Sequence, residues 1–350
     1  MKKAMLVLSV VVLALFGAFS VAAQEDMGTI ADIVVGSTTA ETPEFTVLLA
    51  AVQAADPAIL EAISNPESGL TVFAPTDAAF AAAFEALGVT AADVLADPAA
   101  LTRILQYHVV PGVFNAEAIV ALDGALLGTA AYETALAISV VDGSVLINEA
   151  TVVTPDVIAS NGIVHVIDSV LLPPAKEMAM DEMEATEEPV MEMPGTIVDI
   201  VIAAAAADAP EFTVLLAAVQ AADPSVLATL TSGGPFTVLA PTDAAFTAAL
   251  EALGLTAEEL LADTALLTQV LAYHVLPGHF SATTVIAVGS VEGGSRVATL
   301  LPGTAVTITA TDAGVMVDAA NVVATDIPAS NGGIIHVIDA VLLPPMDGAM

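Results

Sequence analysis

A ten-residue segment that occurs twice limits the possible folds of this chain most strongly. The segment TVFAPTDAAF at 71–80 returns with one change as TVLAPTDAAF at 237–246, an offset of 166 residues. Stacked repeats have periods of about 20–50 residues, so this offset indicates a duplicated whole domain. The closing segments at 165–174 and 336–345 also match. What both copies keep is therefore what one such domain requires.

The first 23 residues predict a secretory signal peptide. Lys2 and Lys3 precede an apolar run at 5–16, and small residues at 21–23 offer a cleavage site. An uncleaved membrane anchor is the alternative, although the stretch is short for a membrane span. The chain has no cysteine, so no disulfide supports an exported domain. At about 150 residues, each copy is large enough to bury a sufficient core.

The charge of the chain is strongly negative. After the signal segment, 41 acidic residues face three basic ones, a net charge of about −38. Such a chain repels phosphate backbones and anionic lipids, so we expect no nucleic-acid partner. The charge is explained by solubility of an apolar chain or by adaptation to high salt, and both alternatives remain open.

Composition divides the chain into five segments. We expect a signal peptide at 1–23, a first domain at 28–174, a linker at 175–194, a second domain at 195–345 and a tail at 346–350. The linker holds seven acidic residues and five methionines, so charge repulsion favours an extended segment. A short amphipathic helix or a soft metal site is the alternative. The long uncharged stretch at 264–291 contains proline, glycine and histidine, so the mature chain is not expected to span a membrane.

The order of elements predicts an α+β domain. Residues 45–56 form an expected helix that ends before a proline, and 70–73 an expected strand. The next helix carries Phe80, Phe84 and Leu87 on one face. Strands at 135–141 and 145–147 form an expected hairpin, with counterparts at 305–311 and 315–317, and 163–167 forms the last strand. Helices followed by strands favour a mainly antiparallel sheet.

Three motifs that occur in order, twice, carry a family resemblance. They are the repeated decapeptide, the Tyr-His pair at 107–108 and 273–274, and the closing block that begins at Asn161. Over nearly the whole mature chain, the sequence resembles two tandem fasciclin (FAS1) domains. The resemblance implies that each domain is a β-sandwich or wedge of mainly antiparallel strands packed with several α-helices. The roles it implies are cell adhesion and attachment to extracellular matrix.

Part of the shared motif is explained by folding. A proline ends each strand, and the Thr-Asp pair after it is placed to cap a helix. His165 and Asp168 point to opposite faces of a strand, which argues against a metal or acid–base pair. The residues that we interpret as structural are Pro75, Thr76, Asp77, His165, Pro241, Thr242, Asp243 and His336.

A candidate adhesion surface follows from the resemblance. In animal members, integrin binding is associated with the Tyr-His region and with a Glu-Pro-Asp-Ile-Met segment. Residues 154–158 retain the Pro-Asp pair but lack the glutamate, and the second half keeps only an Asp-Ile pair. Without a glycosylation sequon the chain is typical of bacteria or archaea, so a partner other than an integrin is expected. The candidate residues are Tyr107, His108, Pro155, Asp156, Ile158, Tyr273, His274, Asp326 and Ile327. For His108 and His274, a buried neutral histidine is the favoured alternative.

The sequence contains no signature of catalysis. It has no cysteine nucleophile, Gly-x-Ser-x-Gly elbow, phosphate loop or His-Glu-x-x-His helix. We expect no enzyme, cofactor or metal, but a secreted or envelope-associated adhesion protein whose partner is an extracellular protein or a polysaccharide. The alternatives are a carrier of an apolar pigment or lipid and a passive envelope component. A partner site is expected where the halves differ: 154–158 against 324–328, and 124–133 against 291–303.

Overall fold

A computed structural model describes residues 27–39, 43–174, 195–207, 210–232, 235–311 and 313–345. The expected signal peptide, the linker at 175–194 and the tail at 346–350 lie outside these ranges.

The two halves contain corresponding helices and strands. The helices of the first half are α1 (Ile30–Thr38), α2 (Thr46–Ala54), α3 (Pro57–Ser64), α4 (Asp77–Leu87), α5 (Ala91–Leu95), α6 (Pro98–Tyr107) and α7 (Ala116–Ala121). Its strands are β1 (Leu70–Pro75), β2 (Val109–Pro111), β3 (Leu126–Gly128), β4 (Ala135–Val141), β5 (Ser144–Ile147), β6 (Ala150–Ala159) and β7 (Gly162–Ile167).

The helices of the second half are α9 (Ile197–Ala205), α10 (Thr213–Ala221), α11 (Pro224–Ser232), α12 (Asp243–Leu253), α13 (Ala257–Ala262), α14 (Thr264–Tyr273) and α15 (Ala282–Gly289). Its strands are β8 (Phe236–Pro241), β9 (Val275–Pro277), β10 (Ser295–Ala298), β11 (Ala305–Thr311), β12 (Gly314–Val317), β13 (Ala320–Pro328) and β14 (Ile334–Ile338).

The Thr-Asp pair of the repeated decapeptide caps two different helices. Thr76 caps α4, because its hydroxyl accepts the Ala79 amide hydrogen at 3.1 Å. Asp77 instead reaches the start of α2, where its carboxylate accepts the amides of Thr46 at 3.2 Å and Val47 at 2.9 Å. The residue before α2, Phe45, has φ 61° and provides no side-chain cap. The aspartate therefore supplies the cap that α2 lacks.

The strands are mainly antiparallel, as expected. Among the described residues they form one sheet in the order β2-β1-β7-β6-β5-β4-β3-β10-β11-β12-β13-β14-β8-β9. Strand β1 pairs with β7 in parallel, and β8 with β14 likewise. The order of the second half mirrors that of the first about the β3–β10 contact. Corresponding strands of the two domains therefore lie at equivalent places on either side of this contact within one sheet.

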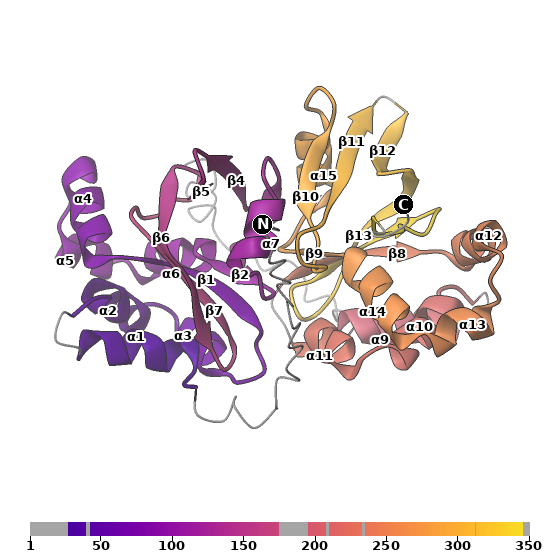
Figure 1. Cartoon of the computed structure of the whole chain (residues 1–350), viewed down its shortest axis with the longest axis horizontal. Helices are drawn as coiled ribbons and strands as arrows, with labels where there is room; N and C mark the ends of the chain where they lie inside the picture. The colour runs from indigo at the N-terminus through magenta and orange to yellow at the C-terminus, as the bar shows by residue number, and fades with distance from the viewer. Residues whose placement is uncertain are drawn as a thin grey trace, which may run out of the picture.

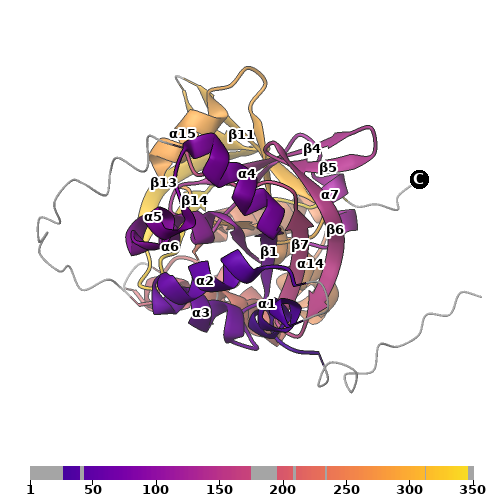
Figure 2. The same cartoon turned by 90° about the vertical axis from the view of Figure 1, so that its left-hand side faces the viewer.

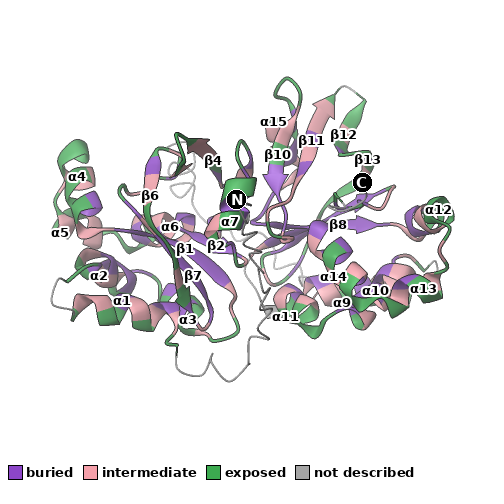
Figure 3. Ribbon diagram, in the orientation of Figure 1, coloured by how far each residue is buried: buried purple, intermediate pink, exposed green. Residues whose placement is uncertain are grey.

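Each half has a core between helices and strands and a second core among its strands. In the first half, Leu48, Ile59 and Leu101 pack under the helices, and Phe73, Leu127 and Ile138 pack among the strands. Helices α1–α6 lie over β1 and β7 when the first half is viewed end-on (Figure 2). Strands β1 and β8 are buried throughout, whereas the outward faces of the helices are exposed (Figure 3).

The two halves meet at the centre of the molecule, where β3 of the first half pairs with β10 of the second (Figure 1). Leu126 of β3 pairs with Val297 of β10. A Cβ atom on Gly128 would lie 1.9 Å from the Pro277 carbonyl oxygen, so only glycine permits this approach. Most of the divergent segments at 124–133 and 291–303 thus lie at or beside the contact with the other half. Part of their divergence is explained by this contact.

No helix of the described residues is both long and apolar enough to cross a bilayer by itself. Two strongly bent helix pairs, α2 with α3 and α10 with α11, satisfy the length and composition criteria only when taken together.

Candidate functional site

The candidate surface of the first half is an irregular strand, β6. Its pairing with β7 shifts register twice, between Val152 and Thr154 and again between Thr154 and Val157. Residues 153–156 are exposed, and Ile158 is 58% exposed. Asp156 lies in the bulge at φ 56°, a conformation that aspartate tolerates better than most residues. The bulge therefore presents Pro155, Asp156 and Ile158 to solvent.

A buried histidine holds this bulge in place through hydrogen bonds. The Asp156 amide donates to Nδ1 of His165 at 3.3 Å, and Nε2 of His165 donates to the Phe114 carbonyl at 2.8 Å. The Asp156 carboxylate accepts the Ala116 amide at the start of α7 at 2.8 Å. Burial lowers the pKa of His165, although the Phe114 carbonyl and Asp156 act against it. One ring nitrogen accepts a hydrogen bond and the other donates one, so this geometry requires the neutral imidazole.

The second half repeats this arrangement. The Asp326 amide donates to Nδ1 of His336 at 3.3 Å, and Nε2 of His336 donates to the Phe280 carbonyl at 2.7 Å. The Asp326 carboxylate accepts the Ala282 amide at 2.8 Å. Asp326 is exposed at φ 58°, whereas Ile327 is only partly exposed. The bulge geometry is thus common to both domains, while the side chains around it differ.

The Tyr-His pairs do not belong to this surface, which corrects the expectation from sequence. Tyr107 and His108 are each 3% exposed, Tyr273 is 4% and His274 is 3% exposed. The Tyr107 hydroxyl donates to the Ala135 carbonyl at 3.2 Å. Their position at the inner end of a helix, against the strands, leaves no face for a partner.

His108 joins α6 to the closing segment of its domain. Its Nδ1 bonds the Ile104 carbonyl at 2.7 Å, and its Nε2 accepts the Leu171 amide at 2.9 Å. Burial lowers the pKa of His108 to about 4, so the ring is neutral at pH 7. His274 makes the corresponding bonds, and burial lowers its pKa to about 4 as well. These two histidines are structural, which is the alternative that the sequence favoured.

Of the remaining residues interpreted as structural, the prolines and Thr242 lie where the folding explanation requires, whereas Asp243, like Asp77, caps an earlier helix instead of the one that follows it. Pro75 and Pro241 end β1 and β8, and Thr242 caps α12 through the Ala245 amide at 3.1 Å. The Asp243 carboxylate accepts the Val214 amide of α10 at 3.0 Å. The decapeptide therefore connects strand, helix and neighbouring helix in each half.

The described residues contain no group of three histidines or carboxylates that could hold a metal. Apolar cavities of about 40 and 70 Å³ lie under α4 and α12. Sites for drug-sized ligands usually measure about 300–1,000 Å³, so these two cavities are too small for a pigment or lipid.

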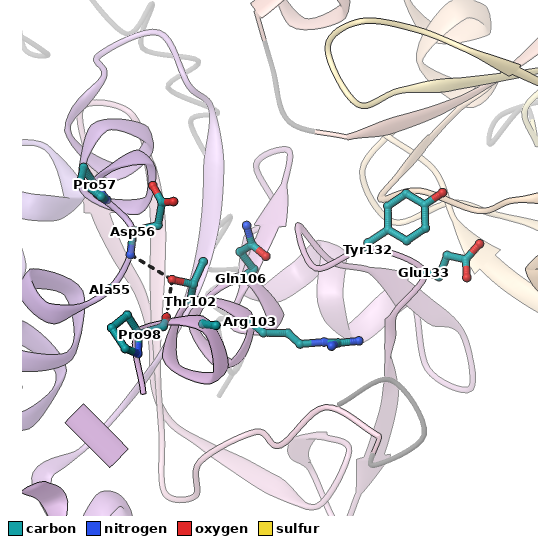
Figure 4. Close-up of a pocket in the computed structure, with 10 residues that line it drawn as sticks. Ala55, Asp56, Pro57, Pro98, Thr102, Arg103, Gln106, Tyr132 and Glu133 are labelled. Atoms are coloured by element: carbon teal, nitrogen blue, oxygen red, sulfur yellow. Dashed lines mark hydrogen bonds between the residues drawn. The ribbon is translucent and has the colours of Figure 1, made fainter. Parts of the chain in front are cut away.

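A larger, open pocket of about 710 Å³ lies beside α6 in the first half. Arg103 extends from α6 toward the side formed by Tyr132 and Glu133, opposite Asp56 and Pro57 (Figure 4). Tyr132 and Glu133 belong to the divergent segment at 124–133, in which a partner site is expected from the sequence, whereas the pocket residues of α6 carried no such prediction. The available signal was that Arg103 and Tyr132 have no counterpart in the other half.

The fasciclin domain family model matches residues 43–173 and 210–344. Protein sll1483 of Synechocystis is 43% identical over 155 residues, covering 44% of this chain and 79% of that protein. Immunogenic protein MPB70 of Mycobacterium bovis is 36% identical over 146 residues, covering 41% and 69% of the two chains. Transforming growth factor-beta-induced protein ig-h3 of Sus scrofa is 35% identical over 153 residues, 43% of this chain but 20% of that protein.

Among solved structures, a FAS1 domain pair from the insect cell adhesion molecule fasciclin I matches with a TM-score of 0.37 and 20% identity. The match covers 84% of this chain and 94% of that one.

Proposed function

Because this chain belongs to the fasciclin domain family, we propose that it is an exported, non-catalytic adhesion protein with two FAS1 domains. The family resemblance implies adhesion and matrix attachment as its roles. The observation that carries the proposal is the duplicated bulge, which holds an aspartate on the surface of each domain through the same hydrogen bonds. The expected signal peptide supports export.

The arrangement of the halves favours binding through two sites on one body. The contact between β3 and β10 and the ring stack between Tyr132 and His279 join the domains directly. Two bulges held on a joined pair of domains act together on a surface that offers repeated partners, because the second contact then forms within an existing complex. Partners that fit are an extracellular protein or polysaccharide of the cell's surroundings.

The experiment measures attachment of the mature chain to cells of the encoding species and to their isolated envelope polysaccharide. Val153 and Ile158, 52% and 58% exposed, and Val323, 57% exposed, flank the two aspartates. We expect V153T and I158T together to weaken attachment, and addition of V323T to weaken it further, because all three positions face solvent.

Leu60 is 41% exposed and belongs to helix α3 rather than to either bulged strand, so L60T is the matched control. Attachment that is equal in the triple variant and in L60T would place the binding surface elsewhere. No attachment of the unaltered chain to cells, envelope polysaccharide or matrix protein would reject adhesion altogether.

A further inference from the structure

The open pocket beside α6 has a framework that both domains keep. The Asp56 amide donates to the Thr102 hydroxyl at 2.9 Å, and this hydroxyl donates to the Pro98 carbonyl at 2.8 Å (Figure 4). In the second half, the Asp223 amide donates to the Thr268 hydroxyl at 3.2 Å. The framework thus joins the turn before α3, or α11, to the neighbouring helix in both copies, and it is a requirement of the fold.

The polar side chains that line the pocket differ between the halves. Arg103 and Gln106 on α6 correspond to Gln269 and Ala272 on α14. The pair at 132–133, tyrosine and glutamate, corresponds to proline and glycine at 302–303. Because the second domain folds without these four side chains, the first domain does not need them for its framework.

The domain contact accounts for only one face of Tyr132. Its ring stacks on His279 of the second half, with centroids 4.1 Å apart and planes inclined by 28°. The tyrosine nevertheless remains 61% exposed. The stack therefore holds an exposed aromatic ring at one side of the pocket, while Arg103 and Gln106 line it from α6.

We propose that this pocket binds a neutral saccharide chain. A guanidinium, an amide and a carboxylate offer paired donors and acceptors at the spacing of neighbouring sugar hydroxyls. An aromatic ring offers an apolar face for the C–H groups of a pyranose. A volume of about 710 Å³ in an open pocket accommodates several sugar units of a longer chain.

The charge of the surroundings favours a neutral saccharide over an anionic one. Asp56 and Glu133 lie in the pocket with Arg103, and the mature chain carries a net charge of about −38. An anionic saccharide is repelled by both. The Asp56 carboxylate already accepts the Ala58 amide at 2.8 Å as a helix cap, so it is a poor cation ligand. Hydrogen bonding to an uncharged polyol fits this mixture of groups.

This inference deepens the proposed function, because it assigns a saccharide-binding site to one domain of an adhesion protein. The test is saturation-transfer NMR on the full mature chain. The probes are neutral hexasaccharides (cellohexaose, laminarihexaose, mannohexaose and chitohexaose), with oligogalacturonate as the anionic counterpart. We expect saturation transfer to at least one neutral hexasaccharide and a much weaker signal from oligogalacturonate.

One double variant copies the second half into the first, and a second variant removes the aromatic ring. R103Q and Q106A together give the pocket the residues at 269 and 272, which the same fold accepts, and should weaken binding about tenfold or more. Y132L removes the aromatic face and should weaken it as well. The control Q269A alters the corresponding helix of the second half and should leave binding unchanged.

Equal binding by the R103Q/Q106A variant and by the unaltered chain overturns the proposal. So do preferential binding of oligogalacturonate and a lack of transfer to every neutral probe. Cell attachment is measured in parallel with the same proteins. Attachment that persists while all neutral probes fail rejects the saccharide site but keeps adhesion through the bulges. Saccharide binding without cell attachment keeps the saccharide site but rejects adhesion.

Discussion

At the scale of single residues, comparison of the two halves distinguishes residues that folding requires from residues with other roles. His108 and His274 occupy the same buried position, and so do His165 and His336. Each accepts one backbone amide and donates to one backbone carbonyl, which only a neutral imidazole can do. The fifth histidine, His279, has no such copy, because Val113 occupies the corresponding position.

Buried neutral histidines make folding sensitive to acid. The folded pKa of His108 is about 4, below the ordinary value of 6.5, so the unfolded chain binds the proton more readily. The stabilising effect of the lowered pKa is complete above pH 6.5 and declines as the pH falls toward 4. At pH 5, the expected decrease in the free energy of unfolding is about 2 kcal/mol per histidine.

We expect the urea midpoint of the unaltered chain to fall between pH 7 and pH 5, and to fall less in H108Q. The glutamine side chain of this variant would retain a donor and an acceptor but would not titrate. Equal pH dependence in both proteins would show that His108 is not the responsible group.

The aspartate of the decapeptide gives a second prediction at this scale. Its carboxylate accepts three hydrogen bonds at the start of α2, two of them from backbone amides. D77A leaves those amides without a cap and should cost about 1–2 kcal/mol in the free energy of unfolding. T76A removes the cap of α4 and should cost about 1 kcal/mol. Urea denaturation tests both, and a D77A variant as stable as the unaltered chain would contradict the cross-helix cap.

At the scale of elements, the bulged strand is the part that sequence reasoning could not obtain. The helix and hairpin positions follow from caps, proline and alternation, and the expected hairpin at 135–147 is present. Residues 150–159 form one long strand, although Pro155 and Asp156 interrupt any strand pattern. Its shape depends on the distant His165 and on α7, and such long-range hydrogen bonds have no local signature. Likewise, local spacing allowed Asp77 to cap α4, and only the fold brings it to α2.

The bulge predicts an order of stability among substitutions of Asp156. This residue has φ 56° and caps α7 through the Ala116 amide. D156N keeps an acceptor and tolerates a positive φ, so it should remain close to the unaltered chain. D156G loses the cap but gains freedom at this φ, whereas D156A loses the cap and is strained. D156A should therefore be the least stable, by about 1–3 kcal/mol. Equal midpoints for D156A and D156N would contradict this account of the bulge.

At the scale of the whole molecule, residues without a copy in the other half converge on the contact between the halves. Tyr132 and His279 stack there, and Nη1 of Arg296 donates to the Asp123 carbonyl at 2.8 Å. Comparison of the two halves within the sequence can identify these residues, but only the fold brings them together. The duplication has thus produced two complementary domains rather than two independent copies.

The last prediction concerns the response of this contact to pH. His279 is 6% exposed, its Nδ1 has no hydrogen-bond partner among the described residues, and burial lowers its pKa. Glu133 and Asp326 favour the charged ring, His336 opposes it, and burial is the largest effect. A separated junction binds the proton more readily, so the closed form is favoured above pH 6.5 and loses this advantage as the pH falls. We therefore expect the halves to separate more often at pH 5 than at pH 7.5.

Because the chain has no cysteine, spin labels at E61C on α3 and S225C on α11 report the distance between the halves without other labelled sites. The distance distribution of the labelled chain should broaden at pH 5. H279V should remove most of this response, because valine does not titrate. The first half has Val113 at the corresponding position, so the fold accepts this side chain. At pH 5, the folded His108 and His274, with pKa values of about 4, remain largely neutral, and circular dichroism verifies that both domains stay folded. Identical broadening with and without His279 would mean that the acidic side chains, rather than this histidine, control the junction.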